Sequence, residues 1–369
     1  MKPDDKAYAE LGTTYARGVL GAPVTKTQTE ILRMLFSPEE AHLAASLDYV
    51  PESEEVVAKR AGVAPEVAAD LLTRMASRSL IRGVRRPDGV RVFRQLLFIP
   101  GLFEMVYISP DPTVDLERLG DLFDKYYLEG WGHEMHGHGI PFDRVLPPIG
   151  PPKESVLPHE DAVKLVQEAP FAALVECQCR QAIRKCDHPI DVCIGLGQGI
   201  MGGPLPGMPV ADPKYAVTPK ARLMSIDEAV HTLKRAEENS LIHVTMNIKK
   251  DPWFICNCCS HACFLVRGAS ELDIPHAIAP SSFWSVVDKD VCNGCGACEP
   301  VCPMLAITVT DKQLAEVDYE RCLGCGVCLN SCPIEALRLE KRSEEIYTPY
   351  LDYNELVTAL GKTEAVHTH

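Results

Sequence analysis

The fold of this chain is decided by a stretch near its C-terminus, Cys292-Asn-Gly-Cys295-Gly-Ala-Cys298-Glu-Pro-Val-Cys302-Pro303. Thirty residues further on, the spacing returns as Cys322-Leu-Gly-Cys325-Gly-Val-Cys328-Leu-Asn-Ser-Cys332-Pro333. Each half reads C-x2-C-x2-C-x3-C-P. Soft thiolates at two-residue gaps suit the iron of iron–sulfur clusters. The alternative is a pair of four-cysteine zinc sites, but those use paired C-x2-C elements rather than a triple followed by Cys-Pro.

The two halves resemble the bacterial-type dicluster ferredoxins, in which the fourth cysteine of each run ligates the other cluster. The resemblance implies a βαββαβ module over residues 286–340, called the dicluster module below. By position, it implies one [4Fe–4S] cluster on Cys292, Cys295, Cys298 and Cys332, and a second on Cys322, Cys325, Cys328 and Cys302. It also implies electron transfer rather than catalysis, because irons that all carry thiolates leave no position open for a substrate.

Eight further cysteines precede this module, in two groups: Cys177, Cys179, Cys186 and Cys193, then Cys256, Cys258, Cys259 and Cys263. Free core cysteines occur singly, so this density predicts metal ligation. A helix precedes a strand ending near Val175, and another precedes a strand ending near Ile248. That alternation predicts a parallel sheet, whose strand ends gather at one edge. The two groups should therefore meet in space.

Local geometry agrees with this expectation. Cys177 and Cys179 would point the same way in an extended chain. If residues 256–263 are helical, Cys256, Cys259 and Cys263 share one face. We favour two additional [4Fe–4S] clusters on the eight thiols, and one cluster with spare thiols is the alternative. This half of the chain resembles multidomain ferredoxin-like proteins of anaerobes, with their Cys-x-Cys-Arg element at 177–180 and Cys-Asn-Cys-Cys element at 256–259, which implies a redox role.

The remaining patterns predict a multidomain α+β protein. Residues 25–100 read as a winged-helix-like domain, with a capping box at Ser37-Pro38-Glu39-Glu40, two further helices, and a hairpin turn at Arg86-Pro87-Asp88-Gly89. Proline-rich residues 110–155 read as a linker with one helix. Residues 156–280 read as an α/β cysteine-rich domain, and 343–369 as a C-terminal tail that docks and then frays.

The whole chain has 369 residues, sixteen cysteines and a formal net charge of −14, which argues against general nucleic-acid binding. No signal peptide or membrane span is predicted, and cysteine-rich chains without export signals are metal proteins of a reducing cytoplasm. We expect redox protein partners, for which the acidic charge suits a basic docking patch. The sequence does not predict the oligomeric state, the donor or the acceptor.

Several other residues offer weaker alternatives. His133, His136 and His138 form a Gly-rich segment that we interpret as structural. His188 and His261 lie beside the extra cysteines and can replace a thiolate or support one. Gly195-Leu-Gly197-Gln-Gly199 is a weak phosphate-loop pattern. An arginine-rich stretch leaves DNA binding open, although we do not expect it: Arg74, Arg78, Arg82, Arg85, Arg86, Arg91 and Arg94.

The leading hypothesis is a cytoplasmic iron–sulfur electron-transfer protein, a carrier or oxidoreductase subunit of a larger anaerobic redox system. The first alternative is an iron–sulfur-dependent transcriptional regulator that uses the winged-helix-like domain. The second is a catalytic reductase whose extra cysteines bind a cluster with an open iron.

Overall fold

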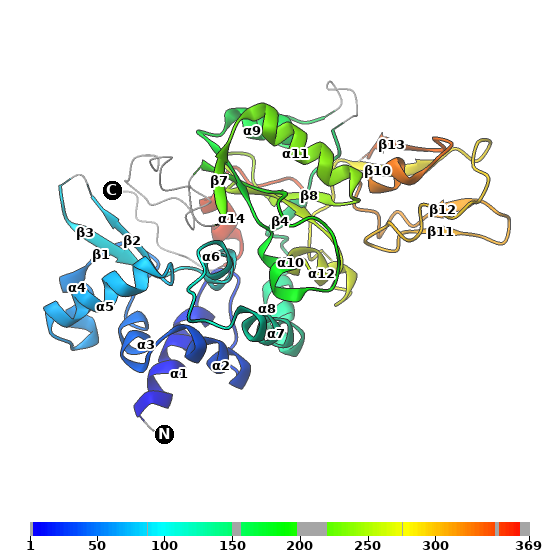
Figure 1. Ribbon diagram of the computed structural model, residues 1–369. Helices are drawn as coiled ribbons and strands as arrows, with labels where there is room; N and C mark the ends of the chain where they lie inside the picture. The colour runs from blue at the N-terminus through cyan, green and yellow to red at the C-terminus, as the bar shows by residue number, and fades with distance from the viewer. Residues whose placement is uncertain are drawn as a thin grey trace.

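The computed structural model describes residues 3–86, 88–149, 156–197, 220–274, 276–343 and 347–361. It is a mixed α/β structure in which the N-terminal helices and the dicluster module lie at opposite ends of a central sheet (Figure 1). Of the Gly195–Gly199 pattern, Gly195 lies within a strand, and Gly199 lies outside the described residues.

The N-terminal part is helical and ends in a small sheet. It comprises α1 (Pro3–Ala16), α2 (Lys26–Leu35), α3 (Pro38–Ala44), α4 (Glu54–Ala61) and α5 (Pro65–Ser77). Ser37 caps α3 with the expected capping box: its hydroxyl accepts from the Glu40 N–H, and the Glu40 carboxylate accepts from the Ser37 N–H. The antiparallel sheet has the order β1 (Glu52–Ser53), β3 (Arg91–Arg94), β2 (Arg82–Arg85). Helix α1, which we did not predict, packs against α3.

The segment that we expected to be a linker forms part of the core. It contains α7 (Leu116–Tyr126), α8 (Gly132–His136) and β4 (Asp143–Val145), and α6 (Phe103–Ile108) precedes it. Trp131 is fully buried, stacks on Tyr126 at 5.3 Å and meets Phe98 edge-on at 5.2 Å. The same apolar core contains Leu11 of α1 and Phe264 of the cysteine-rich part. The linker expectation is therefore wrong: the prolines interrupt its helices, but its aromatic side chains are buried.

The central sheet has six strands in the order β4, β8 (Ile242–Met246), β9 (Phe254–Cys258), β6 (Cys193–Leu196), β5 (Ala172–Val175) and β7 (Ala221–Met224). All neighbouring pairs are antiparallel, so the expectation of a parallel sheet is wrong. The reason is connectivity: β5 returns to its neighbour β6, and β8 turns directly into β9. The helical expectation for residues 256–263 is also wrong, because Cys256 and Cys258 belong to β9.

Helices cover both faces of this sheet (Figure 1). On one face, α9 (Ala162–Glu168) and α11 (Ile226–Glu238) pack against Ala172, Ile194 and Ile255. On the other side lie α10 (Gln178–Ile183), which packs on α7, and α12 (Phe264–Ser270), which packs on α8. The cysteines at the ends of β5, β6 and β9 therefore lie on the side of the sheet that α10 and α12 cover.

The dicluster module adds two antiparallel strand pairs and a short helix. β10 (Phe283–Val287) pairs with β13 (Leu337–Lys341), and β11 (Ile307–Val309) pairs with β12 (Ala315–Val317). α13 (Val327–Ser331) belongs to the second half. The following chain returns to the central sheet, where Tyr350 bridges Ile248 and α14 (Tyr353–Ala359) begins. Within the described ranges, none of the helices has the length and apolar character needed to cross a bilayer.

Candidate metal centres

The dicluster module gathers its eight cysteines into two groups of four. The first dicluster group lines a cavity of about 20 Å³ and consists of Cys292, Cys295, Cys298 and Cys332. The second lines another cavity of about 20 Å³ and consists of Cys302, Cys322, Cys325 and Cys328. Each group contains one cysteine from the other half of the repeat. These are the two sets that the dicluster resemblance implies.

Hydrogen-bond donors surround these sulfurs. In the second group, Ala306 N lies 3.2 Å from Cys302 Sγ, and Ser285 supplies its N–H to Cys322 Sγ at 3.5 Å. In the first group, Ala336 N lies 3.2 Å from Cys332 Sγ. Because N–H donors stabilise negative charge on sulfur, this surrounding fits anionic iron–sulfur clusters.

Two glycines let the backbone pass close to these sites. A Cβ on Gly324 would lie 2.0 Å from the carbonyl oxygen of Phe283, and one on Gly294 would lie 2.2 Å from that of Gln313. Both glycines have positive φ, at 67° and 68°. The Cys-x-Gly-Cys turns therefore require glycine for both conformation and space.

Six of the other eight cysteines form one cluster of side chains, the six-thiol group. Cys177 and Cys179 follow β5, Cys193 begins β6, and Cys263 precedes α12. The Sγ atoms of Cys258 and Cys263 are 3.0 Å apart. Each thiol affects the pKa of two others, so that the six side chains form a ring in the order Cys177, Cys179, Cys263, Cys258, Cys256, Cys193. The two sequence groups thus meet in space, as expected.

Charge is unevenly distributed over the ring. Hydrogen bonds from Cys179 and Cys258 hold the pKa of Cys263 well below its usual range. For Cys193, the hydrogen bond with Cys177 lowers the pKa, but contact with Cys256 and burial raise it to about 12. A lowered pKa favours the thiolate form of Cys263, and the thiolate is the form of cysteine that binds metals.

Arg180 is the counter-charge of this region. Its side chain is only 3% exposed, and its Nη1 donates to the Asn257 carbonyl at 2.9 Å and lies 4.0 Å from Cys259 Sγ. Its Nε and Nη2 are buried and have no hydrogen-bond partner among the described residues. Burial lowers the pKa of Arg180, but the surrounding thiols raise it overall. A buried, incompletely paired guanidinium fits an anionic cluster on the six-thiol group.

All six thiols line one cavity of about 90 Å³. Two acids, the half-buried Glu104 of α6 and the buried Asp143 of β4, line it as well. Burial raises the pKa of Glu104 to about 7 and raises the pKa of Asp143 well above its usual range. The cavity therefore combines thiols with carboxyl groups that can hold a proton near neutral pH.

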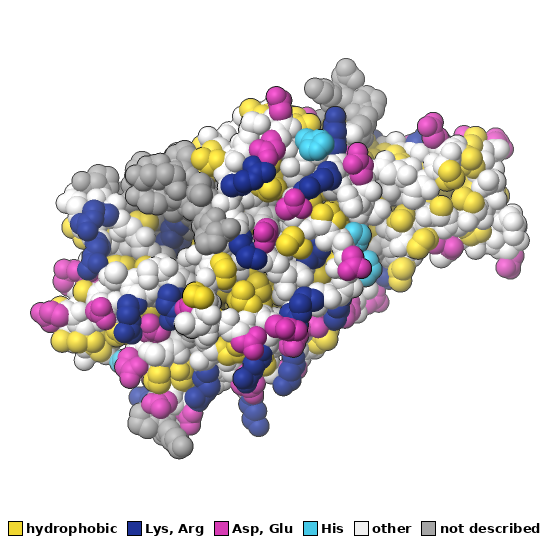
Figure 2. Space-filling model, in the orientation of Figure 1, with side chains coloured by type: hydrophobic (Ala, Val, Ile, Leu, Met, Phe, Trp, Pro, Cys, Tyr) yellow, Lys and Arg dark blue, Asp and Glu magenta, His cyan; other side chains and the backbone are white. Residues whose placement is uncertain are grey.

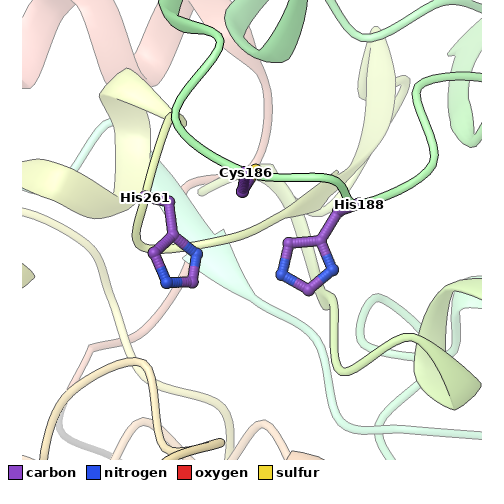
Figure 3. Close-up of side chains that lie close together, drawn as sticks. All are labelled: Cys186, His188 and His261. Carbon is purple, nitrogen blue, oxygen red and sulfur yellow. The ribbon is translucent and has the colours of Figure 1, made fainter.

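The remaining two cysteines lie apart from the ring. Cys186 Sγ is 3.7 Å from Cys259 Sγ. His188 and His261 are beside them, and Figure 3 shows the two imidazole rings with ring nitrogens turned toward the space between them, near Cys186. The eight extra cysteines are thus divided into six and two.

Apolar side chains connect the cysteine groups in series. Cys298 and Cys328 share one buried cluster with Ile307 and Leu337, against which Cys302 also packs. A second cluster contains Cys258 and Cys263, and the second dicluster group packs against it through Cys302, Cys322 and Cys325. The order along the molecule is therefore first dicluster group, second dicluster group, six-thiol group.

The other predicted residues have structural roles. His136 of α8 is buried, with its ring nitrogens 3.0 Å from the Phe264 carbonyl and 3.3 Å from the Ala277 carbonyl. Burial lowers the pKa of His136 to about 4. His136 is therefore a buried residue that packs between two backbone carbonyls, and His133 is exposed.

Most side chains of the arginine-rich stretch are paired with acids or buried within the fold. Arg78 lies 3.1 Å from Glu40 and 2.5 Å from Asp111, and Arg91 lies 2.5 Å from Glu54. Figure 2 shows acidic and basic side chains interspersed over these helices. Six of the seven arginines are paired with acids or buried: Arg74, Arg78, Arg82, Arg86, Arg91 and Arg94.

Sequence reasoning missed several residues of these sites. It quoted Arg180 only as part of a motif, and it gave no role to Ser285, Glu104 or Asp143. Arg180 offered a signal, because a cation one residue from Cys179 and three from Cys177 is a counter-charge candidate. Glu104 and Asp143 offered none, because their position depends on tertiary packing.

The comparisons with known proteins agree with this geometry. Residues 285–339 match the family described as a 4Fe-4S dicluster domain. Nothing in the search of curated proteins matched the chain, and nothing in the search of solved structures did. The C-terminal part of this chain is therefore a 4Fe-4S dicluster domain, and with its many cysteines it indicates iron–sulfur electron transfer.

Proposed function

We propose that this protein passes electrons between the two [4Fe–4S] clusters of its dicluster module and a third iron–sulfur centre on the six-thiol group. In this proposal the two dicluster groups hold one cubane each. Four of the six other thiols suffice for a further [4Fe–4S] cluster, since four cysteines ligate one cubane. The chain would act as a carrier or subunit within a larger redox system.

One observation carries this proposal: the apolar cluster that joins Cys258 and Cys263 to Cys302, Cys322 and Cys325. An isolated ferredoxin module needs no such contact. Here the second dicluster group and the six-thiol group contact the same apolar cluster, and the two dicluster groups share another. Bound clusters supply one-electron redox chemistry, and the protein's role is to hold them in series and exclude water.

The test compares two variants of the anaerobically purified, full-length protein. Cys256→Ser should remove iron in excess of the roughly eight atoms of the dicluster module and leave the interacting EPR signals of its two clusters intact. Cys298→Ala should damage those signals. If the wild-type protein holds no iron beyond the roughly eight atoms of the dicluster module, the six-thiol group holds no cluster and the proposed relay ends at the dicluster module.

A second candidate, a catalytic reductase, is favoured by the cavity. The six thiols, Glu104 and Asp143 line the same space, so a small substrate could receive electrons and protons together. A substrate-dependent change in the spectrum of the third centre, with the dicluster signals unchanged, would support catalysis. If no reducible small molecule changes the spectrum of the third centre, the carrier function is favoured.

For the N-terminal helices and their small sheet we propose a winged-helix-like docking or dimerisation role rather than DNA binding. The support is the neutralisation of the arginine stretch, exemplified by Arg78 with Glu40 and Arg91 with Glu54. We expect only weak binding to duplex DNA, lost as salt rises. Nanomolar, sequence-selective binding at physiological salt would instead select the regulator.

A further inference from the structure

Two short sequence elements with the same spacing face each other beside the six-thiol group. Cys186-Asp-His188 lies in the loop between α10 and β6, and Cys259-Ser-His261 lies in the turn between β9 and α12. Each element reads Cys-x-His. Their rings approach to 5.7 Å between centroids, and the ligand atoms of Cys186, His188 and His261 all lie within 4.8 Å of one another.

We propose that Cys186, His188, Cys259 and His261 bind one tetrahedral zinc ion, separate from the iron–sulfur sites. Two thiolates and two imidazoles are an established zinc ligand set. A tetrahedral ion with zinc–sulfur bonds of about 2.3 Å places its two sulfurs roughly 3.8 Å apart. The observed Sγ–Sγ distance between Cys186 and Cys259 is 3.7 Å.

The two imidazoles distinguish this site from the six-thiol group, which offers thiols alone. A mixed set of thiolates and imidazoles suits zinc, whereas the cubanes proposed for this chain are each held by four thiolates. The expectation that all eight extra thiols hold two cubanes is therefore replaced here by a cluster on six and one ion on two.

The surroundings suit a structural ion. Cys259 is buried, Cys186 and His188 are half-buried, and His261 is exposed, so its ring is free to turn toward the other three ligands. Two thiolates and two neutral imidazoles balance the charge of Zn²⁺, leaving no net charge to bury. Arg180 Nη1 lies 4.0 Å from Cys259 Sγ, where its positive charge would stabilise that thiolate.

The ion would join the two chain segments that build the six-thiol group. The Cys186–His188 loop leads to Cys193, and the Cys259–His261 turn connects Cys258 to Cys263. Zinc has no redox chemistry, so it would fix these segments without taking part in electron transfer. It would hold the loop and the turn together at the cluster-binding end of the sheet.

The experiment measures zinc and iron per chain in the full-length protein purified anaerobically from zinc-supplemented medium. We expect one zinc, whose X-ray absorption shows two sulfurs at about 2.3 Å and two nitrogens at about 2.0–2.1 Å. The double variant His188→Ala/His261→Ala should lose that zinc and keep the eight iron atoms expected of the dicluster module. The matched control, His133→Ala/His231→Ala, removes two exposed histidines and should keep the zinc.

Two outcomes would overturn the proposal. One is wild-type protein without stoichiometric zinc, or with zinc in an all-sulfur shell. The other is a double histidine variant that keeps stoichiometric zinc, which would place the ion at other residues. If the double variant does not accumulate, the single variant His261→Ala changes only an exposed side chain. It should then show a zinc shell with one nitrogen fewer, and an unchanged shell would count against the site.

Discussion

The hydroxyl of Ser285 lies 3.2 Å from Cys328 Sγ. The backbone N–H of the same residue points to Cys322 Sγ at 3.5 Å, so one position of β10 supplies two polar contacts to the second dicluster group. Ser285 connects the outer strand pair of the module to the sulfurs at its centre. It is therefore the position at which a small side-chain change should be visible in the redox properties of one cluster.

We predict that Ser285→Ala lowers the reduction potential of that cluster. A hydrogen bond to sulfur stabilises the more negative, reduced state, so its loss favours the oxidised state. A differential effect of about 0.5–1 kcal/mol corresponds to roughly 20–40 mV for a one-electron couple. The measurement is a potentiometric titration followed by EPR. Ser331→Ala is the control, because the Ser331 hydroxyl donates to the Cys328 carbonyl rather than to a sulfur; equal shifts in both variants would contradict the assignment.

A second prediction concerns the glycines of the Cys-x-Gly-Cys turns. In Gly324→Ala the new Cβ would lie 2.0 Å from the Phe283 carbonyl oxygen, which is backbone and cannot move away cheaply. We expect the second dicluster group to lose its cluster, with iron falling by about four atoms per chain. Gly296→Ala is the matched control, because its nearest neighbour is a Glu299 side-chain oxygen at 3.5 Å. That variant should keep its iron and lose only about 1 kcal/mol of stability to the positive φ.

The third prediction tests the counter-charge. Arg180→Gln removes a buried cation from beside the thiols of the six-thiol group and Cys259. Since removing one partner of a buried charge pair costs about 3–5 kcal/mol, we expect the third centre to be lost during purification while the dicluster EPR signals remain. Arg184→Gln, which removes a half-exposed arginine paired with Asp121, should keep all iron. Full retention of iron in Arg180→Gln would show that the six-thiol group needs no such compensation.

The fourth prediction is a pH dependence. The folded protein holds His136 with a pKa of about 4, whereas an unfolded histidine titrates near 6.5. Between these values the unfolded state binds more protons, so stability falls as pH falls through this window. This single residue should cost about 2 kcal/mol of unfolding free energy between pH 7 and pH 5. Urea unfolding of His136→Gln should show a correspondingly shallower pH dependence than wild type, and His231→Gln, at an exposed site, should show the wild-type slope.

The local elements were largely predictable from the sequence. The strands Ala172–Val175 and Ile242–Met246, the helix that precedes each of them, and the capped helix after Ser37 lie close to where the sequence places them. Strand direction was not predictable. Alternating helices and strands indicated a parallel sheet, but β8 and β9 are joined by a short turn, which only an antiparallel pair can accommodate.

The candidate site was predictable in its composition but not in its grouping. Cys256 and Cys258 lie on a strand, so they point to the same side by the i,i+2 rule that we applied to Cys177 and Cys179. A helix over residues 256–263 would not have placed Cys256 and Cys258 on the same side. The separation of Cys186 and Cys259 from the other six depends on how two loops meet, and no local pattern encodes that meeting.

One further consequence follows from the exposure of Cys295. All sixteen cysteines belong to described segments, and Cys295 is the one whose side chain is exposed. It lies in the first dicluster group, in the module that projects from the central sheet, and the residues 286–340 around it carry nine acidic and four basic side chains. In the proposed relay, the first dicluster group is therefore the end that reaches solvent, and the six-thiol group is the end inside the fold. We predict that a redox partner of this chain presents a basic face to the dicluster module, so that their encounter rate falls with ionic strength.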